Sequence, residues 1–145
     1  MSKHQRYTFA LLSLLFLILG SVIYIYLRPR QDIIFVQNLP FEFKTQIPKE
    51  VCYGSPRYLL IYCLPDAMWY TALLFCQLAL ISNNVVSKII LSTAIISPFV
   101  LELGQSAGLV NGTFDVLDIL SYLCVLTFFI LWYKKSLNQS SKQEH

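Results

Sequence analysis

Four long apolar segments, separated by short groups of polar residues, dominate the sequence. They cover residues 8–27, 58–82, 89–110 and 114–133. A helix needs about 20 apolar residues to cross the hydrocarbon core of a bilayer, and each segment meets that length. The pattern predicts an all-α protein: a bundle of four transmembrane helices in one integral membrane domain over residues 1–145.

The first segment favours an uncleaved anchor over a signal peptide. Its run without charge is about 20 residues long, more than the apolar core of a signal peptide, and tyrosines occupy the region of a cleavage site. Residues 28–57 then form the one sizeable loop, in which residues 33–44 allow either a small hairpin or an amphipathic segment at the membrane surface. The polar tail, residues 134–145, is expected to be disordered.

Pro65 and Asp66 interrupt the second segment and leave two interpretations open. Proline suits the first turn of a helix, and an aspartate there complements the helix dipole. We therefore favour a helix that begins at Leu64 or Pro65, with residues 58–63 as a separate interfacial piece. The alternative is one helix that begins near Tyr58 and bends at the proline.

Composition narrows the class of protein and of chemistry. Apolar types make up 56% of the chain and charged types only 13%, which disfavours a soluble domain, intrinsic disorder and a nucleic-acid-binding surface. The only histidines, His4 and His145, lie near the two ends of the chain. A histidine-dependent nucleophilic site among the helices is therefore excluded.

The basic residues predict the orientation. With four spans both termini share one side, which holds six basic residues against five on the loop side, and the connection between the third and fourth spans has none. The positive-inside rule then places both termini in the cytoplasm.

Four carboxylates lie within or beside the apolar segments: Asp66, Glu102, Asp115 and Asp118. Ionisable groups in spanning helices are costly and are by default functional candidates. Counted along the helices, all four belong to the extracytoplasmic leaflet, whereas Lys88, the only basic residue between the second and fourth spans, lies on the other side.

Helical spacing groups these side chains further. Glu102, Gln105 and Ser106 share one face of the third span, and Asp115, Asp118 and Tyr122 share one face of the fourth. We expect a pocket with Glu102 and Gln105 as its floor and the three aspartates as its rim. Such a pocket suits a divalent cation, a cationic group or acid/base chemistry. The alternative is structural: helix-start roles for the aspartates and a hydrogen-bonded, protonated Glu102.

The cysteines add little to this picture. Cys63, Cys76 and Cys124 lie in apolar segments, where a small apolar filler is the expected role. A disulfide between Cys52 and Cys63 is conceivable if the loop is extracytoplasmic. No paired C-x-x-C motif is present, so no zinc or redox motif and no cofactor is identified.

The order of polar residues resembles the VanZ-like family, small bacterial membrane proteins named for a teicoplanin-resistance accessory protein. The resemblance covers about residues 60–129 and rests on Leu64-Pro65-Asp66, on Glu102-x-x-Gln105 and on Asp115-x-x-Asp118. The chain is similar to a divergent member, with Ala67 where the family has a lysine. The resemblance implies a location in the inner membrane of a bacterial cell and a cell-envelope role linked to tolerance of glycopeptide antibiotics.

The sequence is therefore compatible with three functional hypotheses. The first is a membrane protein that binds a lipid-linked or peptidoglycan-related ligand in the acidic pocket. The second is an enzyme that uses the same acids, with or without a metal, on a lipid-linked substrate. The third is a helper subunit that packs against a larger membrane protein. No catalytic motif is present, and a binding role is favoured over catalysis.

Overall fold

The computed structural model describes residues 3–28, 51–82 and 84–142, with side chains up to residue 134. Within these residues every element is helical, and four helical segments are long and apolar enough to cross a membrane. They are α1 (Lys3–Leu27), the segment Pro56–Leu80, α4 (Val85–Ser106) and α5 (Val116–Lys142). The prediction of an all-α, four-helix, multi-pass membrane protein is confirmed.

The second span is one continuous helical run. It consists of α2 (Pro56–Tyr58), a π-helical turn η2 (Leu59–Cys63) and α3 (Leu64–Leu80). The Leu64 N–H donates to the carbonyl of Leu59, the i→i−5 bond of a π-helix. The predicted helix start at Leu64 coincides with the start of α3, but residues 58–63 are helical and continuous with it and do not form a separate piece. The wider π-helical turn accommodates Pro65 in the helix, because Pro65 has no backbone N–H to donate to an earlier carbonyl.

Helix ends differ from the predicted spans where local hydrogen bonds decide them. α4 begins at Val85 because the Asn84 side chain accepts a 2.8 Å bond from the Ser87 N–H. It ends at Ser106, so the connection to α5 is longer than the predicted turn. α5 continues to Lys142 through residues that were expected to be disordered, a stretch without glycine or proline to stop it.

α1 packs closely along α3. A Cβ at Gly20 would lie 2.8 Å from Cδ1 of Trp69, so only glycine permits this approach. The Trp69 indole donates to Ser21 Oγ at 3.3 Å, and the Ser13 hydroxyl donates to the Ala72 carbonyl at 2.8 Å. Small and hydroxyl side chains are typical of such interfaces between membrane helices.

A buried aromatic cluster joins the other helices. Its centre is Tyr70 and Leu74 of α3 with Tyr122 of α5. The Tyr70 hydroxyl donates to the carbonyl of Ile95 in α4 at 3.0 Å. Pro98, which cannot donate to the carbonyl four residues earlier, weakens the backbone ladder at the same level of α4.

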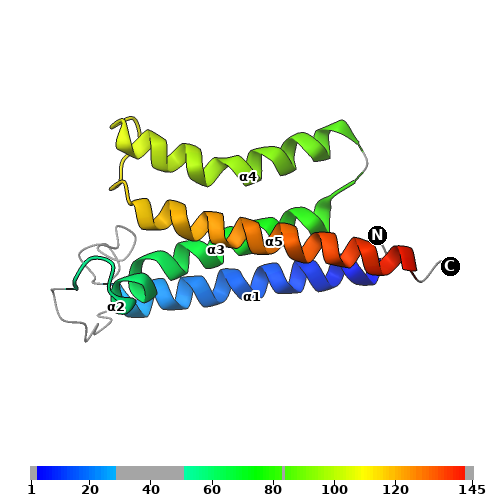
Figure 1. Ribbon diagram of the computed structural model, residues 1–145, viewed down its shortest axis with the longest axis horizontal. Coiled ribbons are helices and arrows are strands. Elements are labelled where there is room, and N and C mark those ends of the chain that lie inside the picture. The colour runs from blue at the N-terminus through cyan, green and yellow to red at the C-terminus, as the bar shows by residue number, and fades with distance from the viewer. Residues whose placement is uncertain (1–2, 29–50, 83, 143–145) are drawn as a thin grey trace, which may run out of the picture.

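The bundle has two distinct ends (Figure 1). α2, the last turn of α1 and the α4–α5 connection lie at one end, called here the α2 end, whereas the first turn of α1 and the last turn of α5 lie at the other. The predicted hairpin or surface segment at residues 33–44 lies outside the described residues.

Candidate functional site

A cavity of about 650 Å³ opens at the α2 end of the bundle. Residues of α1, η2, α3, α4, the α4–α5 connection and α5 contribute to its wall. The residues that line it are Tyr24, Arg28, Tyr62, Asp66, Pro98, Leu101, Glu102, Gln105, Gly112, Thr113, Asp118 and Tyr122. The wall thus combines one guanidinium, three carboxyl groups, an amide and three phenols within a bundle of apolar helices.

The predicted site residues come together here. Asp66, Glu102, Gln105 and Asp118 all line the cavity, and Asp115 lies directly beside it, within 4.8 Å of Asp118 by their carboxylate oxygens. Ser106, which shares the helical face of Glu102, is exposed and donates to the carbonyl of Leu103 instead. The predicted floor therefore consists of Glu102 and Gln105 alone.

Asp115 is the residue that starts α5. Its Oδ1 accepts a 2.8 Å bond from the Leu117 N–H, as an N-terminal cap does. Two phenols donate to the same carboxylate: Tyr53 to Oδ1 at 2.8 Å and Tyr58 to Oδ2 at 2.5 Å. Burial acts to raise the pKa of Asp115, but these hydrogen bonds outweigh it and hold that pKa below its usual value. Asp115 is thus a helix cap that also holds two tyrosine hydroxyls.

Tyr53 responds to the same contact. Its hydrogen bond to Asp115, together with the carboxylate charge, raises the pKa of Tyr53 above its ordinary 10.0. The Tyr53 and Tyr58 rings lie 5.0 Å apart, and the Tyr58 and Tyr62 rings 4.7 Å apart. These three phenols form one aromatic wall that leads from Asp115 to the cavity.

Glu102 joins α4 to the start of α5. Its Oε2 accepts a 3.2 Å bond from the backbone N–H of Asp115, and the residue is only 6% exposed. Gln105, one turn later, lies against Gly112, where a Cβ would come within 2.5 Å of the amide nitrogen. The α4–α5 connection therefore packs directly on the floor of the cavity.

Arg28 is the residue that sequence reasoning missed. Its guanidinium lies over two rings, 4.6 Å from the centre of Tyr24 and 5.1 Å from that of Tyr62. The carboxylates at this end therefore do have a basic neighbour, although sequence reasoning considered only Lys88, on the other side. Its Nε is buried and has no hydrogen-bond partner. The one sequence feature that could have indicated this role is that Arg28 directly follows an apolar run of membrane length.

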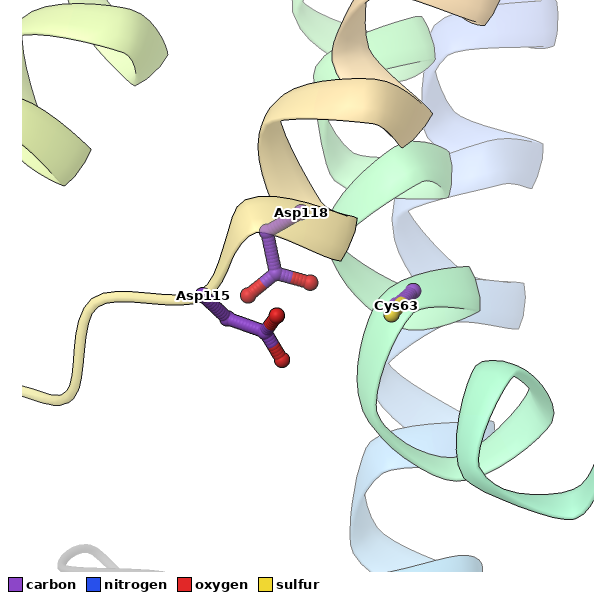
Figure 2. A group of neighbouring side chains, drawn as sticks. All are labelled: Cys63, Asp115 and Asp118. Carbon is purple, nitrogen blue, oxygen red and sulfur yellow. The ribbon is translucent and has the colours of Figure 1, made fainter. Parts of the chain in front are cut away.

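Cys63 is buried, as expected of a small apolar filler, but it also lies beside two carboxylates that sequence reasoning did not connect with it. It is 3% exposed, and its Sγ lies within 4.8 Å of carboxylate oxygens of both Asp115 and Asp118. Figure 2 shows the two carboxylates and the thiol pointing toward a common space. Cys52 and Cys63 are both free, so the conceivable disulfide between them is wrong. The position of Cys63 along the sequence, one turn before Asp66, does not indicate that it lies next to α5.

A smaller cavity of about 190 Å³ adjoins the first. The two share Asp66, Pro98, Leu101 and Tyr122, and the smaller one is otherwise lined by Trp69, Tyr70, Leu73 and Ser97. It lies between α3, α4 and α5, and Asp66 is its one charged lining residue. The polar cavity thus continues into a largely apolar one.

Neither models of protein families, nor curated proteins, nor solved structures match this chain.

Proposed function

We propose that this chain is a VanZ-like protein of the bacterial inner membrane that binds the polar head of a lipid-linked or peptidoglycan-related ligand in the cavity at the α2 end. The observation that carries the proposal is the wall of that cavity, in which Arg28 faces the same space as Asp66, Glu102 and Asp118. Ionisable groups are costly in spanning helices and are retained where they serve a ligand or a pathway.

The wall indicates the chemistry of the head group. Carboxyl groups outnumber the single guanidinium, so the complementary head carries amines or several hydroxyl and amide donors. Arg28 offers a planar set of N–H donors that suits a phosphate or carboxylate oxygen. A head with donors and at least one anionic oxygen, such as an amino sugar or a short peptide on a phosphate, satisfies both.

The adjoining cavity indicates that the ligand is an amphiphile. Leu101 and Tyr122 belong to both cavities, and Trp69, Tyr70 and Leu73 extend the smaller one with mostly apolar surface. A ligand with a polar head in the larger cavity can lay the start of its lipid chain there.

The location follows from the same proposal. Both termini are assigned to the cytoplasm, and the cavity, at the opposite end of the bundle, then faces the extracytoplasmic leaflet where envelope precursors are used. The resemblance to the VanZ-like family adds a proposed link to glycopeptide tolerance.

Native mass spectrometry of the full chain, purified in mild detergent from its own membranes, tests the binding proposal. We expect a bound amphiphile in the wild type and loss of most of it in Glu102→Gln and Arg28→Gln. Lys88→Gln is the matched control because it removes a charge near the other end of α4, and it should retain the ligand. Equal occupancy in all four proteins would overturn the proposal.

A cellular measurement tests the wider role. Expression of the wild type should raise the teicoplanin concentration that a susceptible host tolerates, and Glu102→Gln should abolish the increase at equal protein level. A co-purified protein subunit, with no bound amphiphile, would favour the helper role instead.

A further inference from the structure

Three buried side chains from two segments of the chain surround one point beside the cavity. Cys63 comes from η2, Asp115 caps α5, and Asp118 lies in its first turn. One ligand atom from each, a sulfur and two carboxylate oxygens, lies within 4.8 Å of the others. Figure 2 shows all three directed toward the space between η2 and the start of α5.

Asp118 gives a second and separate observation. The residue is 8% exposed, and its buried Oδ1 has no hydrogen-bond partner. A buried carboxylate oxygen without a partner is expensive, and native structures rarely leave one unsatisfied. A cation at this point would satisfy it.

Asp115 is already held in the orientation that a ligand needs. Its Oδ1 accepts two bonds, from Tyr53 and the Leu117 N–H, whereas Oδ2 accepts one, from Tyr58. A carboxylate oxygen has two lone pairs, so Oδ2 retains one for a cation. Donors behind a ligating carboxylate fix its position and tune its basicity, which is the role the two phenols would have.

We propose that Cys63, Asp115 and Asp118 bind a divalent transition-metal ion, zinc in the first instance. The mixed set decides the metal class: thiolate and carboxylate together suit zinc, whereas calcium and magnesium take oxygen ligands only. On binding, the thiol gives its proton to solvent and the thiolate donates to the ion. Asp118 also lines the cavity, which supplies an entry path and a side from which a fourth ligand reaches the ion.

The test uses the full chain in detergent, with zinc as the probe. We expect one zinc ion per chain after dialysis, and X-ray absorption of the loaded wild type should show one sulfur neighbour at about 2.3 Å. Zinc bound with oxygen or nitrogen neighbours only, or no zinc retained, overturns the proposal without recourse to any variant.

Variants then assign the ligands. Cobalt in place of zinc should give a thiolate-to-metal charge-transfer band that persists in Cys52→Ser/Cys76→Ser/Cys124→Ser and is lost in Cys63→Ser. Asp118→Asn should weaken zinc binding at least about tenfold. A band that persists in Cys63→Ser, or unchanged zinc affinity in both single variants, contradicts the assignment.

This inference stands apart from the ligand proposal. Cys63 does not line the cavity, so Cys63→Ser tests the metal alone, and Arg28→Gln, at a residue of the cavity wall that is not a proposed ligand, tests the amphiphile alone. Failure of one leaves the other intact.

Discussion

The backbone N–H of Asp115 donates to Oε2 of Glu102 over 3.2 Å, which ties the start of α5 to the last turns of α4. Glu102 is the carboxylate farthest from a helix start, and this bond gives it a partner at membrane depth. The same side chain lines the cavity. The bond therefore couples the shape of the cavity to the α4–α5 connection.

Removal of that acceptor should destabilise the protein. We expect Glu102→Ala to lower the free energy of unfolding by about 1–3 kcal/mol, because the Asp115 N–H is left buried without a partner. Glu102→Gln keeps an acceptor oxygen and should lose less. Thermal unfolding in detergent measures both, with Leu103→Ala, at the exposed neighbouring position, as the control. A Glu102→Ala protein as stable as the control would show that the bond contributes nothing.

Substitution of two glycines in the α4–α5 connection distinguishes the effect of backbone strain from the effect of a changed cavity shape. Gly108 and Gly112 both have positive φ, 69° and 144°, so an alanine at either should cost about 1–3 kcal/mol. Only at Gly112 does the added Cβ meet the Gln105 side chain; at Gly108 nothing lies within 4 Å. Gly112→Ala should therefore release the bound amphiphile, and Gly108→Ala should keep it, by native mass spectrometry. Equal retention would remove Gln105 from the binding wall.

Much of this fold was readable from the sequence, because apolar runs of membrane length between charge clusters have few alternative structures. The gathering of Asp66, Glu102, Gln105 and Asp118 was readable too, since helical rise and antiparallel connection place them at one end. Asp115 was correctly considered as a cap, a role set by its immediate neighbours along the chain.

Arg28 and Cys63 could not be placed in this way. Arg28 reaches the cavity only because α1 packs along α3, and Gly20 against Trp69 fixes that approach. Cys63 faces α5 because the π-helical turn at residues 59–63 shifts the register of every side chain before Pro65. Both depend on packing between segments distant in sequence, which periodicity does not record.

The contact of Gly20 with Trp69 gives a prediction about that packing. We expect Gly20→Val to cost about 1–3 kcal/mol, because its side chain must displace the indole from α1. Leu19→Val introduces the same branched side chain at an exposed position of the same helix and should cost less. Thermal unfolding compares the two, and equal losses would mean that α1 does not approach α3 this closely.

The contact between Tyr53 and Asp115 should be detectable in the pH titration of the Tyr53 phenol. Its raised pKa means that the folded protein holds the phenol proton more tightly than the unfolded chain, so this contact stabilises the fold below pH 10.0 and loses its effect as pH rises through the folded-state value. The Tyr53 transition, taken as the ultraviolet difference between wild type and Tyr53→Phe, should move down toward 10.0 when Asp115 becomes asparagine. An unchanged midpoint would rule out the contact.

The most direct test of the cavity as the ligand site is a photo-crosslinker at single positions of α4 in living cells. Leu101 lines both cavities, whereas Leu103, two residues along and on another face of the helix, lines neither. A crosslinker at Leu101 should capture the amphiphile that co-purifies with the wild type, and one at Leu103 should capture bulk phospholipid. The same adducts from both positions, or bulk phospholipid alone at Leu101, would contradict a ligand held between Arg28 and the carboxylates.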